Sequence, residues 1–137
     1  MLAKPLLTFL VLIVAGNYAG LLLGWYWSAR WYDIPMHIAG GAWIALLFFY
    51  LLERKIGHPV EGNLLSLLLR ALGFVALMGL FWEFYEYLGD TLILKKYAWG
   101  EALRGQAFDT LLDLFNDLVG GILTTTAYFF LRKPSSE

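Results

Sequence analysis

Four long apolar stretches divide this chain, and their length sets the fold that it can adopt. They cover residues 5–28, 34–53, 64–89 and 109–132, with polar segments between them. About 20 residues of α-helix cross the hydrocarbon core of a bilayer. The chain is also 60% hydrophobic, against about 45–50% for a soluble domain. We therefore predict an all-α integral membrane bundle of four transmembrane helices, a single domain over residues 1–137 with both termini on the same side.

Composition excludes several classes of function. The formal net charge of −1 provides no basic surface, so we expect no nucleic-acid partner. Cysteine is absent, which excludes a disulfide framework, a thiolate metal site and a cysteine nucleophile.

The fourth apolar stretch carries acidic residues where a membrane helix rarely has any. Asp109, Asp113, Asn116 and Asp117 lie within it, spaced so that most of them share one helical face. A carboxylate at the bilayer centre costs about 2.5–3.5 kcal/mol on insertion scales, so intramembrane acids usually belong to a functional site. We favour a functional cluster over a purely structural one.

Polar residues of two other stretches are expected at the same depth. Asp33 and His37 lie one turn apart where the second stretch begins, and Glu83 and Glu86 lie one turn apart near the end of the third. In a bundle of four antiparallel spans, these positions and the start of the fourth stretch face the same side of the membrane. The sequence therefore predicts one acidic pocket on the side opposite the termini.

Such a pocket needs a way to reduce its negative charge. Packed carboxylates must be partly protonated, bind cations, or be capped by bases from neighbouring loops; the candidate bases are Arg30, Lys95, Lys96 and Arg104. A metal is the economical solution, and we expect one or two divalent metal ions. Oxygen ligands favour Mg, Mn or Ca, and an imidazole admits Fe or Zn. The candidate metal ligands are Glu83, Glu86, Asp109, Asp113, Asp117 and His37.

His37 and Asp33 are the candidate catalytic residues. His37 would be a ligand or a general base, and Asp33 its orienting partner. The structural alternative makes Asp33 and Asp109 helix caps and Glu86 an interfacial residue. It leaves Glu83, Asp113 and Asp117 unexplained.

Two further features concern the surroundings of the bundle. Gly16, Gly20 and Gly24 recur every four residues, a spacing that lets another helix approach closely. We expect this seam to serve packing, and we expect a homo-oligomer or a larger membrane complex to form through it.

Residues 90–108 are expected to form an interfacial flap or a short amphipathic helix.

The basic residues predict the orientation in the membrane. Six lie on the side of the termini, against four on the side of the pocket: Lys4, Arg54, Lys55, Arg70, Arg132 and Lys133, against Arg30, Lys95, Lys96 and Arg104. Cytoplasmic loops of membrane proteins carry an excess of lysine and arginine. We therefore expect a multi-pass protein of the bacterial inner (cytoplasmic) membrane, with cytoplasmic termini and a pocket facing the exterior.

The order of these motifs resembles the VanZ-like family of small bacterial membrane proteins and the similar YjdF-type inner-membrane family. The motifs are Asp33-x-x-x-His37, the Glu83 and Glu86 pair, and Asp109-Thr110-x-x-Asp113 with Gly120. Asp117 stands where the VanZ-like pattern usually has asparagine, and Glu86 where glutamine is common, so this pocket is more acidic. The resemblance implies a four-helix membrane protein linked to the bacterial envelope and to glycopeptide resistance, and no established reaction.

Three functions are compatible with these features, and the sequence does not decide whether the protein is an enzyme. The first is a metal-dependent enzyme that acts on a lipid or a lipid-linked envelope substrate. The second is a protein that binds or transports a cation or a cationic headgroup. The third is an accessory subunit of a larger membrane complex.

Overall fold

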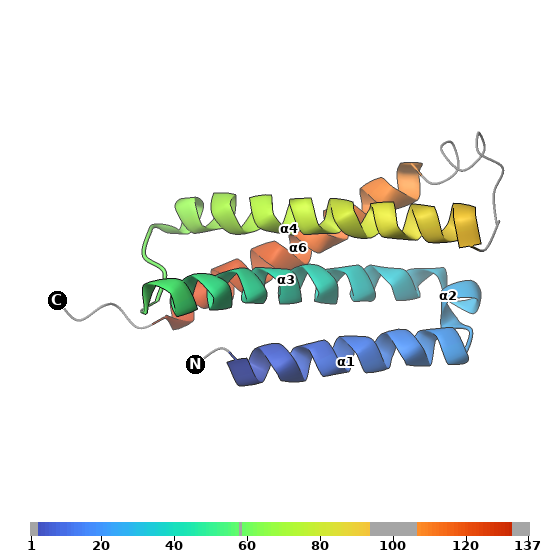
Figure 1. Cartoon of the computed structure of the whole chain (residues 1–137), viewed down its shortest axis with the longest axis horizontal. Helices are drawn as coiled ribbons and strands as arrows, with labels where there is room; N and C mark the ends of the chain where they lie inside the picture. The colour runs from blue at the N-terminus through green and yellow to red at the C-terminus, as the bar shows by residue number, and fades with distance from the viewer. Residues whose placement is uncertain (1–2, 58, 94–106, 133–137) are drawn as a thin grey trace.

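The computed structural model of the chain describes residues 3–57, 59–93 and 107–132. Its four long helices are α1 (Ala3–Leu22), α3 (Asp33–Ile56), α4 (Leu64–Leu88) and α6 (Ala107–Leu131). Each is long and apolar enough to cross a membrane, and the described part of the chain contains no strand. Figure 1 shows the start of α1 and the end of α6 at the same end of the molecule. The predicted all-α membrane bundle of four helices is confirmed.

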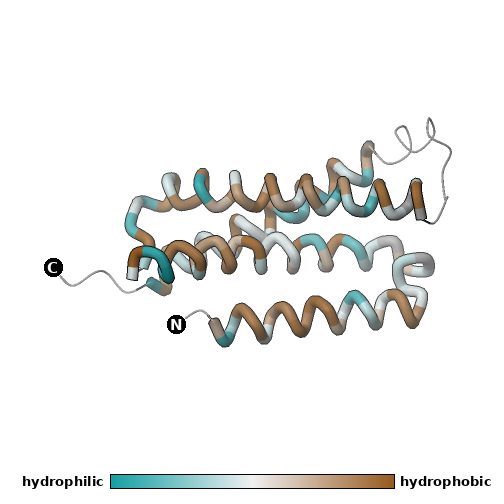
Figure 2. Tube along the Cα trace, viewed as in Figure 1, coloured by the Kyte–Doolittle hydropathy of each residue, from teal (hydrophilic) through white to brown (hydrophobic). Residues whose placement is uncertain are grey.

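Three of the helices form the core, and the first is peripheral. α6 packs most extensively against α3 and next against α4, whereas α1 packs mainly against α3. In Figure 1, α6 crosses behind α3 and α4, and α1 runs along the outer side of α3. Most of the apolar surface of α1 is therefore left for lipid, and Figure 2 shows this helix as mainly hydrophobic.

The backbones of α3 and α6 touch at two glycines. A Cβ atom on Gly41 would collide with the backbone of Asp117, and one on Gly120 would collide with the carbonyl group of Ile38. Small residues at such crossings let membrane helices approach closely. This contact fixes the rotation of α6, so that Asp113 and Asp117 face the inside of the bundle.

The glycine seam of α1 is filled by side chains of the same chain. A Cβ atom on Gly16 would lie 3.5 Å from the sulfur atom of Met36. One on Gly20 would meet the rings of Tyr26 and Tyr32. Two of the three glycines thus serve packing within the chain. Oligomerisation through this seam stays a prediction.

The first predicted helix, 5–28, is broken near its end. Gly24 has a left-handed backbone, with φ 69°, a conformation that glycine adopts without steric cost. The chain then forms two short turns of helix, α2 (Trp25–Ser28) and η1 (Arg30–Tyr32), before α3 begins. The apolar pattern continues through this bend, which is why it predicted one uninterrupted helix.

Two tyrosines hold this bend against α1. The hydroxyl group of Tyr26 donates to Oδ1 of Asn17 at 2.7 Å, and that of Tyr32 donates to the Gly16 carbonyl at 2.8 Å. Burial, with a contribution from the charge of Asp33, raises the pKa of Tyr26 to about 12, so its hydroxyl group keeps its proton. These two hydrogen bonds therefore hold the bend against α1.

α4 ends in a short π-helix, η2 (Gly89–Ile93). The predicted flap at residues 90–108 lies largely outside the described residues, and so do Lys95, Lys96 and Arg104. The side chain of Arg30 is outside them as well. The prediction that these bases cap the pocket therefore stays a prediction.

Candidate metal centre

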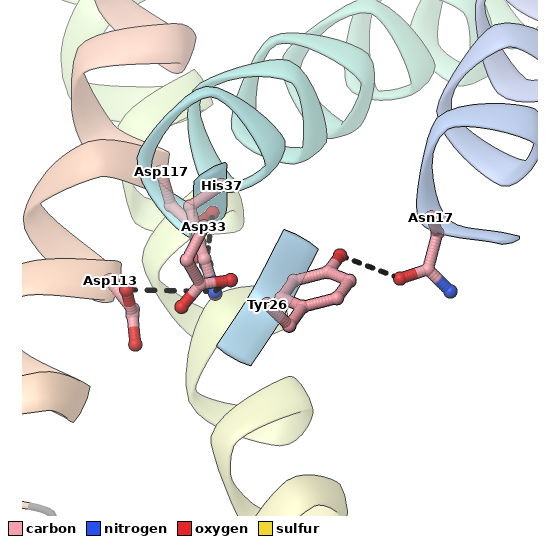
Figure 3. Close-up of polar contacts among 6 residues, drawn as sticks. All are labelled: Asn17, Tyr26, Asp33, His37, Asp113 and Asp117. Carbon is pink, nitrogen blue, oxygen red and sulfur yellow. Dashed lines mark hydrogen bonds and ion pairs between the residues drawn. The ribbon is translucent and has the colours of Figure 1, made fainter. Parts of the chain in front are cut away.

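His37 is the centre of the polar cluster. It lies one turn into α3 and is buried, with 7% of its surface exposed. Its Nδ1 atom is 3.3 Å from Oδ1 of Asp117, and its Nε2 atom is 3.7 Å from Oδ1 of Asp33 and 3.7 Å from Oδ1 of Asp113. Figure 3 shows the three carboxylates converging on the ring. The two ring nitrogens therefore face different acids.

Asp117 occupies a space that glycines provide. A Cβ atom on Gly79 of α4 would lie 2.6 Å from Oδ2 of Asp117, and one on Gly40 of α3 would lie 3.8 Å from Oδ1. The residue is only 4% exposed. The carboxylate thus fits between α3 and α4 because α4 has no side chain at Gly79, while a Cβ atom at Gly40 would make only an ordinary van der Waals contact.

Glu83 brings a buried carboxylate from α4. It is 9% exposed, and among the described residues its Oε1 atom has no hydrogen-bond partner. A buried polar atom without a partner is costly, and each such case in a folded protein calls for an explanation. An ion bound at this atom would supply the missing interaction.

Two groups of residues have the spacing of metal ligands, and they share His37. One consists of Asp33, His37 and Asp113, and the other of His37, Glu83 and Glu86. Within each group, one ligand atom per residue lies within 4.8 Å of the others. An imidazole surrounded by carboxylate oxygens is a donor set that fits a divalent cation. The residues present therefore fit the predicted metal site.

The electrostatics of the cluster point the same way. Among the described residues, His37 is the one base within ion-pair distance of Asp33, Asp113 and Asp117. A single imidazole cannot neutralise several carboxylates, and burying uncompensated charge in an apolar bundle is costly. A divalent cation would offset this charge at one point.

The predicted site residues differ in where they lie. His37, Glu83, Asp113 and Asp117 are buried, while Asp33 is half-buried and Glu86 is exposed. Asp109 lies on the exposed first turn of α6 and belongs to neither ligand group. The cluster therefore has a buried inner part and a more exposed rim, which Asp33 and Glu86 form.

Sequence reasoning assigned no role in the site to Gly79 and no ligand role to Asn116. Gly79 precedes Glu83 by four residues on the same face of α4, and that spacing was the available signal for its role beside Asp117. Asn116 was placed with the aspartates in the predicted functional cluster, but it was not named as a ligand. It is buried, and its Nδ2 atom has no hydrogen-bond partner among the residues that the structure describes.

The chain belongs to DUF2238, a family of predicted membrane proteins, whose sequence profile matches residues 4–134. Searches of curated proteins and of solved structures find no match. Family membership and the four apolar helices agree on a multi-pass membrane protein.

Proposed function

We propose that this protein is a metal-dependent membrane enzyme that acts on a lipid or a lipid-linked substrate of the bacterial envelope. The observation that carries the proposal is the buried His37, which two groups of potential ligands share, beside the Oε1 atom of Glu83, which has no hydrogen-bond partner among the described residues. Intramembrane acids are too costly to be retained without a use. A metal centre explains their number, their convergence and the unpaired oxygen together.

The two nitrogens of His37 have separate roles in this proposal. With the proton on Nδ1, the ring donates to Asp117 at 3.3 Å, and the lone pair of Nε2 faces Asp33 and Asp113. Metal-binding histidines usually hold their second nitrogen in this way against a carboxylate. Asp117 is then the orienting residue rather than a ligand. The buried ligands are His37, which both groups share, Asp113 of the first group and Glu83 of the second.

In this proposal, the substrate reacts at the more exposed rim of the cluster. A divalent ion in this site would polarise an ester or phosphoryl oxygen of the substrate and would lower the pKa of a bound water. Asp33 is half-buried beside Nε2, so its carboxylate is accessible to accept a proton from an attacking water as a general base. Glu86, which is exposed, would complete the coordination on the substrate side.

The depth of the site supports a lipid substrate. The cluster lies at the end of the bundle next to α2 and η1, where Trp25 and Trp31 are exposed. Such aromatic residues concentrate at the level of the lipid headgroups. A site at this depth would meet the ester and phosphate groups of membrane lipids directly.

The proposed orientation rests on charge. The opposite end of the bundle carries Lys4, Arg54, Lys55, Arg70 and Arg132 among the described residues. By the positive-inside rule, that end lies in the cytoplasm and the site faces the exterior of the inner membrane. The resemblance to the VanZ-like and YjdF-type families supports a role in the envelope.

A cation-binding or transport protein is the second candidate, and an accessory subunit the third. Directly beyond the site, the backbone contacts of Gly41 and Gly120 close the space between α3 and α6. Further along, the apolar Phe49, Leu67 and Val75 are completely buried, and so is the polar Thr125. Apolar side chains thus predominate among the fully buried residues described beyond the site, so binding without transport is the stronger form of this alternative.

Elemental analysis of the purified protein tests the metal centre. We expect wild type to retain one or two divalent ions per chain, and Glu83→Gln and Asp113→Asn to retain less than a tenth of that amount. Asp109→Asn is the matched control, because Asp109 is an acid of the same helix outside both ligand groups. Folded wild type without metal, or an equal loss in Asp109→Asn, would contradict the proposal.

The lipid reaction needs a second assay. Wild type and Glu83→Gln are incubated with vesicles of bacterial lipid extract, with and without a chelator, and the lipids are then analysed by mass spectrometry. We expect a product that forms with wild type and disappears with the chelator or the variant. Metal binding without any such product would support the binding protein instead.

A further inference from the structure

A groove of about 120 Å³ lies between α1 and α3, toward the end of the bundle opposite the acidic cluster. It is open to the side of the molecule, and its walls are almost entirely apolar. The residues that line it are Ala3, Leu6, Leu7 and Leu10 of α1 with Trp43 and Tyr50 of α3. Since both helices span the membrane, the groove faces the lipid bilayer.

The polar atom of its largest side chain is already bonded within the protein. Nε1 of Trp43 donates to the carbonyl oxygen of Leu6 at 2.9 Å. This bond holds the indole ring against α1, so the groove presents the apolar part of the ring. The walls therefore favour a hydrocarbon chain over a polar group.

The end of the groove nearest the termini has a basic rim. Lys4 is exposed in the first turn of α1, and Arg54 lies one turn after Tyr50, with its guanidinium carbon 5.7 Å from the centre of the Tyr50 ring. The adjacent acid, Glu53, accepts a hydrogen bond from Tyr128 of α6 at 3.0 Å. The carboxylate of Glu53 thus binds a residue of the bundle core, and this end of the groove keeps the positive charge of Lys4 and Arg54.

We propose that this groove is a binding site for an anionic phospholipid. One acyl chain lies between α1 and α3, and the phosphate group lies at the helix ends, where Arg54 and Lys4 contact it. Guanidinium groups bind phosphate through two parallel hydrogen bonds, and basic residues next to a membrane span attract anionic lipids. A zwitterionic lipid would fill the same groove with less gain from the two bases.

Native mass spectrometry of the detergent-purified full chain tests the site. The protein is titrated with dioleoyl phosphatidylglycerol or with dioleoyl phosphatidylcholine, which has the same acyl chains. We expect phosphatidylglycerol to bind at least about fivefold more tightly, and Arg54→Ala to remove most of this preference, since one basic residue contributes about a fivefold difference near a membrane surface. Lys55→Ala is the matched control, because it removes the same charge from the next residue.

A second pair of variants tests the groove itself. Leu7→Trp fills it, whereas Leu12→Trp adds the same bulk to α1 at an exposed position outside the lining. We expect Leu7→Trp to weaken the binding of both lipids about tenfold, and Leu12→Trp to leave it unchanged. Because Leu7 and Leu12 are both 64% exposed, neither change disturbs the core, and a thermal melt of each variant verifies this.

Three results would overturn the proposal. Equal losses in Arg54→Ala and Lys55→Ala would mean that the lipid senses only the net charge of this end. Unchanged binding in Leu7→Trp would mean that the acyl chain lies elsewhere. A dimer in the same spectra that Leu7→Trp abolishes would mean that a second copy of the chain occupies the groove.

Discussion

His37 is a buried residue whose two ring nitrogens face different carboxylates, and this asymmetry defines the site. Nδ1 faces Asp117, which is held between two helices, and Nε2 faces Asp33 and Asp113. The position of the Asp117 carboxylate depends on Gly79, because a Cβ there would lie 2.6 Å from Oδ2. The site is therefore sensitive to a methyl group on a residue that carries no chemistry of its own.

Gly79→Ala tests this dependence at the scale of one residue. The added methyl group displaces the Asp117 carboxylate and releases the ring of His37, so we expect metal affinity to fall about 10–100-fold. The overpacking costs about 1–3 kcal/mol of unfolding free energy. Isothermal titration with Mn²⁺ measures the affinity, and denaturant titration in micelles measures the stability.

Gly73→Ala is the matched control on the same helix. A Cβ at Gly73 has nothing within 4 Å, and replacing glycine by alanine in an open helical position stabilises a helix by up to about 1 kcal/mol. Its metal affinity should equal that of wild type. If Gly79→Ala and Gly73→Ala bind Mn²⁺ equally well, Asp117 does not orient His37.

At the scale of the elements, the crossing of α3 and α6 determines which way the acids point. The contact joins backbone to backbone at Gly41 and Gly120. A rearrangement of side chains therefore cannot make room for a larger residue at either position. The same crossing seals the bundle beyond the site. Packing and the proposed chemistry thus depend on one interface.

Gly120→Ala and its neighbour Gly121→Ala separate backbone contact from side-chain contact. A methyl group on Gly120 meets the backbone of Ile38 and forces α3 and α6 apart, whereas one on Gly121 meets side-chain atoms, those of Leu72 at 2.9 Å and of Val75 at 3.2 Å. We expect Gly120→Ala to lose at least about 3 kcal/mol of unfolding free energy, and Gly121→Ala about 1 kcal/mol. Denaturant titration in micelles measures both, and equal losses would contradict the backbone contact.

At the scale of the whole molecule, the number of helices and the convergence of the acids followed from the sequence. Apolar length alone predicts a membrane span. Asp33, Glu83 and Asp113 then fall at one depth because antiparallel spans alternate in direction. Both inferences need only the positions of residues along the helices.

The remaining features depend on how each helix is rotated and where side chains point. Asp109 shares a sequence motif with Asp113 yet lies on the exposed first turn of α6. The glycine seam of α1 is predicted to let another helix approach, and Gly16 does lie against Met36 of α3, but the rings of Tyr26 and Tyr32 fill the seam at Gly20. That outcome follows from the bend at Gly24, which an apolar pattern does not reveal.

The central claim is that His37 binds a divalent ion among carboxylates, and pulsed electron paramagnetic resonance of the Mn²⁺-loaded protein tests it most directly. Mn²⁺ suits carboxylate and water ligands, and a coordinated imidazole adds nitrogen modulation to its signal. We predict modulation from one imidazole in wild type and in Asp109→Asn, and its loss in His37→Ala. Bound Mn²⁺ without nitrogen modulation in wild type, or modulation that persists in His37→Ala, would contradict the account.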